Sequence, residues 1–299
     1  MQEMEITEKV NTRIDSYLAT LLSMSRSKIA KMLKENYILV NDKEVKASYE
    51  LQIGDNITIL EYVEEEMSAE PEEMDLDIVY EDDDVMVVNK ANGVVVHPAV
   101  GNNHGTLVNG LLFHSKNLSS VNGEFRPGIV HRIDAYTTGL LMIAKNDQAH
   151  QFLAEQLSNK TTKRKYQAIV WGVIPHDTAT IDAPIGRDES DRKKMTVTSK
   201  NSKQAVTHFR VLKRFKSATL IECELETGRT HQIRVHMNYI GYPIVNDPVY
   251  GKRKLLDDSG QCLHAKTIGF VHPRTKEYME FDSELPECFL NIERYFEEE

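Results

Sequence analysis

The stretch that organises this sequence, residues 128–146, reads GIVHRIDAYTTGLLMIAKN. A polar segment at 131–138 is followed by a glycine and a short apolar run at 140–144. A short apolar run bounded in this way predicts a buried strand. The polar segment is then a loop on a rigid scaffold, where binding and catalytic groups concentrate. Asp134 and Arg132 are therefore candidate functional residues, although an isolated loop aspartate more often caps a turn.

Length and composition favour a globular protein with two domains. The chain has 299 residues, of which 40% are hydrophobic and 27% are charged. No apolar run approaches the roughly 20 residues that a membrane crossing needs, and the N-terminus shows no secretory signal. The three cysteines are far apart and fit neither a disulfide framework nor a zinc pattern. We expect a cytoplasmic protein without a membrane partner.

Charge is distributed unevenly along the chain. The net charge is −10, which argues against a nucleic-acid partner at first sight. Residues 61–84 contain 13 acidic and no basic residues, whereas residues 160–234 contain 16 Lys or Arg against 8 Asp or Glu. A basic middle segment can meet a phosphate backbone, although such segments are also common on ordinary surfaces.

Residues 12–60 form a compact unit by their pattern. A helix begins near Arg13, a second helix begins at Ser25 or Ser27, and strands follow at 37–40 and 56–60.

This pattern resembles the alpha-L RNA-binding domain. The features that match are the SRSK helix start, the Val-Asn turn and the LxxGD ending. In that domain, basic helix residues meet RNA phosphates. The resemblance implies this role for Arg13, Arg26, Lys28 and Lys31. Without it, these residues are equally well explained as solvated helix charges. An acidic linker at 61–76 then leads to a large domain at 77–299.

The segment HRIDxxTTGL at 131–140 resembles the catalytic motif of the RluA/RluD family of pseudouridine synthases. Further motifs follow the order of that family. They are NKANGVVVHP at 89–98, KRKYQAIVWG at 163–172, LETGRTHQIRVH at 225–236 and DPVYG at 247–251. The resemblance covers about residues 12 to 290. It implies an α+β catalytic domain with a bent, mostly antiparallel sheet and an active-site cleft across it.

These enzymes isomerise uridine to pseudouridine in RNA without a cofactor. The resemblance implies that Asp134 is the catalytic carboxylate, either as a nucleophile at C1′ or by assisting loss of the base. It pairs Arg234 with Asp134, and an adjacent cation favours the ionised carboxylate. It implies that Tyr166 stacks on the uracil and relays a proton.

The same resemblance names the substrate-binding residues. Arg132 fills the gap that the extruded uridine leaves, and its planar guanidinium suits stacking. His131 braces the loop, and Thr137 and Thr138 shape it. The remaining members of the set are Lys90 and Arg229 in the large domain and Arg26 and Lys28 in the small one.

A metal site is not expected. His231 and His236 lie five residues apart with no glutamate between them, which fits no common ligand spacing.

One departure from the family pattern concerns the target. Ala135-Tyr136 stands where most members carry a charged pair, which affects RNA contacts more than activity. The nearest type is RluD, which acts on 23S rRNA. A tRNA target and an rRNA-binding assembly factor with secondary catalysis are the alternatives, and we expect a monomer.

Overall fold

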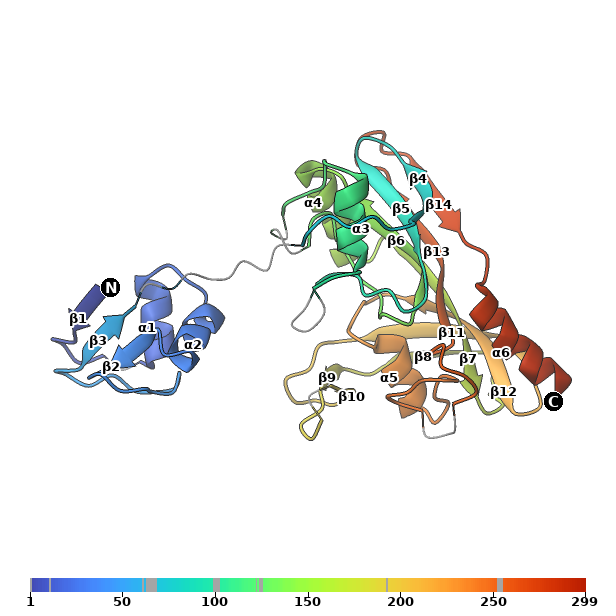
Figure 1. Ribbon diagram of the computed structural model, residues 1–299. Coiled ribbons are helices and arrows are strands. Elements are labelled where there is room, and N and C mark those ends of the chain that lie inside the picture. The colour runs from blue at the N-terminus through green and yellow to red at the C-terminus, as the bar shows by residue number, and fades with distance from the viewer. Residues whose placement is uncertain are drawn as a thin grey trace. The chain divides into compact units, whose positions relative to one another are not determined.

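A computed structural model describes residues 2–10, 12–60, 62, 69–98, 103–121, 123, 126–191, 193–251 and 255–299 (Figure 1). The chain divides into two compact units, Met1–Glu66 and Met67–Glu299. Residues 61 and 63–68 of the expected acidic linker lie outside the described residues, as does Arg192. Within the described residues, no helix combines the length and the apolar composition that crossing a membrane requires.

The small unit packs two helices on a three-stranded antiparallel sheet of order β1-β3-β2. The helix start at Ser25 is confirmed, since its side chain accepts a hydrogen bond from the Lys28 backbone N–H. Asn36, after the second helix, has a φ of 63°, which asparagine tolerates better than most residues. The first strand was not anticipated. The elements are β1 (Gln2–Glu5), α1 (Ile14–Leu21), α2 (Arg26–Lys34), β2 (Ile38–Val40) and β3 (Asn56–Ile59).

The large unit is built on a nine-stranded sheet of order β4-β5-β6-β13-β7-β12-β11-β8, with β14 also paired to β13. Its strand pairs are antiparallel except for β6 and β13, so the expected α+β fold with a mostly antiparallel sheet is confirmed. The strands are β4 (Asp77–Glu81), β5 (Val85–Lys90), β6 (Thr138–Ala144), β7 (Lys163–Trp171), β8 (Thr178–Asp182), β11 (Val206–Arg214), β12 (Ala218–Leu225), β13 (Leu263–Val271) and β14 (Tyr278–Asp282).

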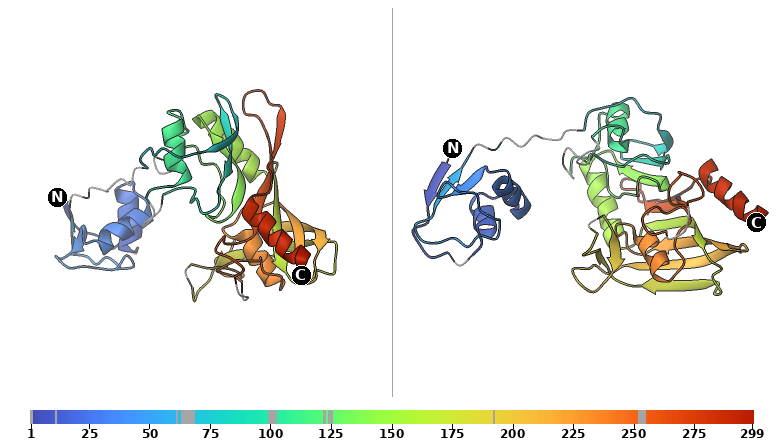
Figure 2. Two further views of the ribbon diagram at one scale, coloured as in Figure 1. Left: turned by 45° about the vertical axis from the view of Figure 1, so that its right-hand side comes forward. Right: turned by 60° about the horizontal axis from the view of Figure 1, so that its bottom comes forward.

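Four helices accompany this sheet. One of them begins after Thr106, whose side chain forms a capping box with Asn109. The C-terminal helix packs Phe296 against Trp171 of β7, with ring centroids 5.3 Å apart. Figure 2 shows this helix in red beside the mark of the C-terminus. The helices are α3 (Leu107–His114), α4 (Asp147–Ser158), α5 (Gln232–Tyr239) and α6 (Glu287–Glu298).

Three segments differ from what their sequence alone indicates. Residues 163–165 belong to β7 instead of a basic loop, because β7 pairs with β13 along this whole segment. The segment 182–195, whose basic residues favour a loop, instead leads through a hairpin of β9 (Ile185–Arg187) and β10 (Met195–Val197). The three valines at 94–96 favour a strand by composition, but residues 94–97 are not in one.

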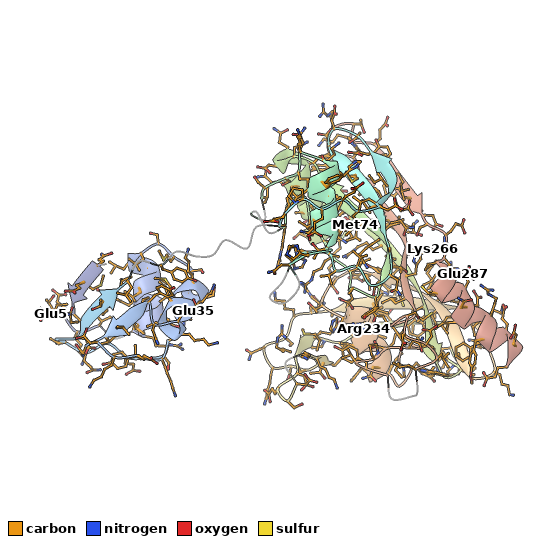
Figure 3. The ribbon with its side chains drawn as sticks, in the orientation of Figure 1. Glu5, Glu35, Met74, Arg234, Lys266 and Glu287 are labelled. Carbon is orange, nitrogen blue, oxygen red and sulfur yellow. The ribbon has the colours of Figure 1, made fainter. Side chains whose placement is uncertain are left out.

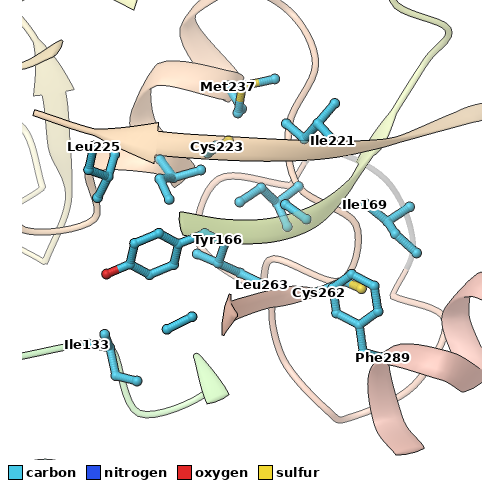
Figure 4. Close-up of a cluster of buried hydrophobic side chains, with 14 of the residues drawn as sticks. Ile133, Tyr166, Ile169, Ile221, Cys223, Leu225, Met237, Cys262, Leu263 and Phe289 are labelled. Atoms are coloured by element: carbon cyan, nitrogen blue, oxygen red, sulfur yellow. The ribbon is translucent and has the colours of Figure 1, made fainter. Parts of the chain in front are cut away.

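Strand β7 positions the functional site because its side chains alternate between two faces. Arg164, Tyr166 and Ala168 are buried on one face, whereas Lys163 and Lys165 on the other are only partly buried. Tyr166 lies at the margin of the main hydrophobic cluster, between Leu225 and Ile133 in the view of Figure 4.

Gly139 allows the parallel pairing of β6 with β13. Its φ is +108°, and a Cβ at this position would overlap the backbone of Ala265, approaching the nitrogen to 2.7 Å. Gly93 also has a positive φ, +78°, but a Cβ there would meet nothing within 4 Å.

We expect Gly139→Ala to destabilise the large unit by roughly 3 kcal/mol or more, because backbone atoms cannot yield as a flexible side chain would. Gly93→Ala should cost only about 1 kcal/mol, from the backbone conformation alone. Denaturant unfolding followed by fluorescence of the single tryptophan, Trp171, measures both values. Equal losses for the two variants would contradict this role of Gly139.

Candidate active site

Asp134 sits on the loop that precedes β6, and several contacts hold this loop. The backbone N–H of Thr137 donates to the Asp134 carbonyl oxygen at 3.0 Å. The ammonium group of Lys90 donates to the Ala135 carbonyl at 2.7 Å. The ring of His131 accepts a hydrogen bond from the Met142 backbone N–H at 3.1 Å. The loop is therefore fixed to β5 and β6, and the backbone of Asp134 has little freedom.

Lys90 lies beneath this loop and does not line the cleft described below. Only 2% of the residue is exposed, and its Nζ also donates to the Ala91 carbonyl at 2.8 Å. Burial lowers the pKa of Lys90 to about 7, although the nearby Asp134 charge opposes the shift. The structure thus places Lys90, expected among the substrate-binding residues, as a support of the Asp134 loop.

Arg234, on α5, joins two carboxylates. Its Nη1 donates to Asp134 Oδ2 at 2.8 Å, which is the pairing that the family resemblance implied. Its Nε and Nη2 donate to the two oxygens of Asp247 at 2.7 and 2.9 Å, a bidentate contact. Figure 3 marks Arg234 in the large unit. Every guanidinium nitrogen of Arg234 therefore has a carboxylate partner.

The environment keeps both Arg234 and Asp247 ionised. Burial alone would lower the pKa of Arg234, but Asp247 and Asp134 outweigh it and raise that pKa. Burial would raise the pKa of Asp247, but Arg234 and the backbone N–H groups of Tyr250 and Val249 lower it. Asp247 therefore acts as a fixed anion that orients the guanidinium.

Tyr250 connects this arrangement to His231. The ring of Tyr250 lies 5.2 Å from the Arg234 guanidinium carbon, and its hydroxyl oxygen accepts from the Met195 backbone N–H at 2.9 Å. The same hydroxyl lies 2.8 Å from His231 Nδ1. We infer that it donates to Nδ1, which leaves the ring proton on Nε2. His231 Nε2 lies 3.8 Å from Asp134 Oδ1, the oxygen that Arg234 does not hold.

A cleft with a volume of about 400 Å³ opens above Asp134. The Asp134 side chain is 25% exposed there, and Tyr166 forms part of the wall. Burial raises the pKa of Tyr166, Arg164 opposes the shift and Asp134 adds to it, so the phenol is neutral. Five arginines line the cleft: Arg126, Arg132, Arg164, Arg229 and Arg234. The cleft is thus cationic around one carboxylate, despite the acidity of the whole chain.

The remaining expected residues of the large unit fall into two groups. Arg132 and Arg229 line the cleft; Arg132 donates to Thr230 Oγ1 at 3.0 Å and Arg229 to the Gln204 carbonyl at 2.8 Å. The two threonines are buried and hold the loop: Thr137 accepts from the Gln261 side chain at 3.1 Å, and Thr138 lies 2.8 Å from His264 Nδ1.

Asp247, Tyr250, His231 and Arg164 were given no functional role from the sequence. Asp247 and Tyr250 fall in the DPVYG motif, so an aspartate two residues after the apolar pair 244–245 was the available signal. His236 bonds Thr207 and the Ala183 carbonyl, both at 2.9 Å, while His231 faces Asp134. The two histidines therefore do not form a common metal site.

Family comparisons account for both units. Residues 84–239 match the RNA pseudouridylate synthase family, and residues 12–57 match the S4 domain. The first match spans more than half of the chain. The chain belongs to the RNA pseudouridylate synthase family. It is therefore an RNA pseudouridine synthase, an isomerase, as its motifs indicated.

Individual relatives of this RNA pseudouridine synthase agree. The Uncharacterized RNA pseudouridine synthase YlyB of Bacillus subtilis (strain 168) is 56% identical over 296 residues, covering 98% of this chain and 97% of that protein. Ribosomal large subunit pseudouridine synthase D of Neisseria meningitidis serogroup B is 44% identical over 298 residues, covering 95% and 79%. The solved structure of Human RNA Pseudouridylate Synthase Domain Containing 1 gives a TM-score of 0.57 at 26% identity, covering 71% of this chain and 84% of that one.

The S4 domain of this RNA pseudouridine synthase carries the basic residues expected to meet RNA. Arg13 and Arg26 both bind Asp15 Oδ2 at 2.9 Å, and their side chains remain 47% and 57% exposed. Lys28 Nζ lies 6.0 Å from the centroid of the Tyr62 ring. Asp15 therefore orders the two arginines while leaving much of their surface open to solvent.

The buried Lys90 predicts a pH dependence of stability in the synthase. Its pKa is about 7 in the folded protein and about 10.4 in an unfolded chain. Between these values the unfolded chain binds a proton that the folded protein lacks, so the free energy of unfolding rises with pH. We expect Lys90→Met to remove about 1.4 kcal/mol of this rise per pH unit.

Denaturant unfolding followed by Trp171 fluorescence between pH 7 and 10 tests this expectation. Lys116→Met, at an exposed lysine, is the matched control and should keep the slope of the wild-type protein. Parallel curves for the wild-type protein and Lys90→Met would show that Lys90 keeps its proton when buried.

Proposed function

We propose that this pseudouridine synthase modifies large-subunit ribosomal RNA, with Asp134 as the catalytic carboxylate. The target is supported by relatives named ribosomal large subunit pseudouridine synthase D, which are 44% identical in Neisseria meningitidis and 41% identical in Zymomonas mobilis. The carboxylate assignment is carried by one observation. Asp134 is the single carboxylate among the described residues that line the cleft.

One carboxylate suits the isomerisation and not glycoside hydrolysis, which uses two carboxylates on either side of the bond. The reaction breaks the C1′–N1 bond, forms a C1′–C5 bond, and moves one proton from C5 while N1 gains one. Because nothing is oxidised or reduced and no atom leaves, we propose that no cofactor takes part.

The two oxygens of Asp134 have different roles in this proposal. Oδ2 is held by Arg234 at 2.8 Å, so Oδ1 is the oxygen available to the sugar. It can attack C1′ directly, or it can stabilise the positive charge that develops as the base departs. Arg234 is bound by both carboxylates and therefore cannot move away from Asp134 without leaving Asp247 with an unpaired buried charge.

In this proposal Tyr166 contacts the uracil base, and Arg132 contacts the RNA from which that base is extruded. The Tyr166 ring forms a wall against which uracil can stack, and its neutral hydroxyl can carry the proton between C5 and N1. Arg132 lies two residues before Asp134 in the sequence and is exposed at the cleft, which suits insertion into the gap left by an extruded uridine.

We extend the proposal to the organisation of the chain. Residues 12–60 bind RNA through Arg26 and Lys28, and residues 77–299 carry out catalysis. The protein works as a monomer in the cytoplasm, where its proposed rRNA substrate is made and modified. A single species at the monomer mass in sedimentation analysis is the expected result.

Mapping of pseudouridine in total RNA tests the central proposal. Cells lacking the gene are complemented with the wild-type protein, Asp134→Asn or Asp177→Asn, and sites are read by carbodiimide labelling and primer extension. Asp177 is exposed and binds Arg214, so Asp177→Asn is a matched control outside the cleft. Sites in large-subunit rRNA should vanish in the deletion and return with the wild-type protein and Asp177→Asn only.

Other outcomes select the alternatives. Loss of sites in tRNA alone would replace the rRNA target. Full restoration by Asp134→Asn would remove Asp134 from the chemistry. If all rRNA and tRNA sites persisted in the deletion, an RNA-binding assembly factor would become the better account.

A further inference from the structure

Arg164 is a buried cation in the cleft, and no residue in the described part of the chain is an anionic partner for it. Only 7% of the residue is exposed, and its Nε is buried without a hydrogen-bond partner among the described residues. Its Nη2 reaches the Leu225 and Glu226 carbonyls only at 3.5 and 3.4 Å, longer than ordinary N–H···O bonds. No described carboxylate lies within ion-pair distance of Arg164, in contrast to Arg234.

A buried guanidinium in this state is costly. It cannot lose its proton under ordinary conditions, and buried charges in proteins are normally paired. Burial lowers the pKa of Arg164, with Arg229 adding to the shift and Tyr166 opposing it. A folded protein that maintains such a group without internal compensation has a place prepared for an anion from outside.

The surroundings of Arg164 keep its guanidinium open to the cleft. Arg164, Gly228 and Arg229 all line the cleft. A Cβ on Gly228 would lie 2.8 Å from Arg164 Nη1, so the glycine makes room for the guanidinium. A second cation, Arg229, therefore faces the same space, where a single anion can neutralise both.

The position of Arg164 relative to Tyr166 indicates which anion. The two side chains lie on the same face of β7, two residues apart, which corresponds to roughly 6.6 Å along the strand. A base stacked on Tyr166 would place the sugar–phosphate of its own nucleotide, and not a distant one, within reach of Arg164.

We propose that Arg164, with Gly228 making room for it, binds a phosphodiester group that flanks the target uridine. The proposal rests on the RNA-modifying function given above and assigns a phosphate site beside Asp134 in the same cleft. Charge pairing on binding would hold the extruded nucleotide in place while C1′ meets Asp134.

A rival role for Arg164 is activation of Tyr166 as a base. The guanidinium does favour the charged phenolate, but burial and Asp134 together keep the pKa of Tyr166 above its ordinary value. The two roles differ in what they require of the RNA, because only the phosphate site depends on a charge in the substrate backbone.

The test pairs variants of the enzyme with RNAs that lack one charge. The RNA is a synthetic stem–loop around the uridine identified by mapping, with a neutral methylphosphonate at the linkage 5′ or 3′ of that uridine. Enzymes are the wild type, Arg164→Gln, Arg164→Lys and Arg210→Gln. Arg210 binds Glu222 on the sheet and is the matched control outside the cleft.

We expect Arg164→Gln to lower kcat/KM by roughly 10- to 100-fold on the fully charged RNA, the usual effect of losing a charged hydrogen bond. Arg164→Lys should lie between this variant and the wild type, and Arg210→Gln should match the wild type. One of the two neutral linkages should lower kcat/KM of the wild type by a similar factor, with no further loss in Arg164→Gln.

Three results would overturn the proposal. The first is that neither neutral linkage changes kcat/KM of the wild-type enzyme, and this result is decisive even if Arg164→Gln does not fold. The second is that the loss of kcat/KM from Arg164→Gln and the loss from the neutral linkage multiply, for the 5′ linkage and for the 3′ linkage alike. The third is that Arg164→Gln shifts the pH–rate profile and its loss of kcat/KM is the same on charged and neutral linkages, as activation of Tyr166 would require.

A binding measurement separates this proposal from the proposed function. Each Arg164 and Arg210 substitution is introduced into Asp134→Asn, and binding of the charged and neutral RNAs is measured by fluorescence anisotropy. The dissociation constant then takes the place of kcat/KM in the comparison. If Asp134→Asn still catalyses, the assignment of Asp134 fails while the coupling between Arg164 and the phosphate can still be read. If mapping moves the target to tRNA, the stem–loop is taken from that tRNA.

Discussion

The active site depends on one buried arginine shared by two carboxylates. Arg234 binds Asp247 through two nitrogens and Asp134 through the third. Asp247 is fully buried as a side chain, whereas Asp134 keeps a quarter of its side chain exposed. The arginine is thus anchored on its inner side and presents Asp134 to the cleft from its outer side.

This interaction requires segments from distant parts of the chain. Asp134 lies 100 residues before Arg234, and Asp247 lies 13 residues after it. The loop of Asp134 is positioned by β5 and β6, and β6 lies beside β13 only because Gly139 permits their close approach. The long sheet therefore serves to bring one loop and one helix, α5, to a common point.

The two buried arginines of the cleft differ in their electrostatic state. Arg234 has its charge balanced within the protein, so it acts as a structural and orienting group. Arg164 has no such balance among the described residues, which reduces stability and leaves a charge for the substrate to neutralise. This division explains how an acidic protein with a net charge of −10 can bind a polyanion in one cleft.

Much of the fold and the chemistry could be read from the sequence. The capping residue Ser25 and the apolar run at 140–144 are local signals, and each predicted its element correctly. The family motifs led to Asp134, Tyr166 and Arg234, which the fold brings to one cleft.

The failures have a common physical cause. Residues 163–165 are three consecutive basic residues, yet pairing with β13 makes them part of a strand. Its outer face carries Lys163 and Lys165, whereas Arg164 is buried on the inner face. Lys90 and Asp247 are charged residues that the sequence could not show to be buried. Arg164 was hidden for the same reason, because a lack of partners becomes visible only when the surrounding chain is in place.

The coupling between Arg234 and Asp247 tests this account most directly. Single-turnover rates at saturating RNA are measured for Arg234→Lys, Asp247→Asn and the double variant. If Asp247 acts on Asp134 through Arg234, the double variant should be no slower than the slower single variant, a coupling of roughly 1–3 kcal/mol. Losses that multiply in the double variant would show that the two residues act independently and would contradict the account.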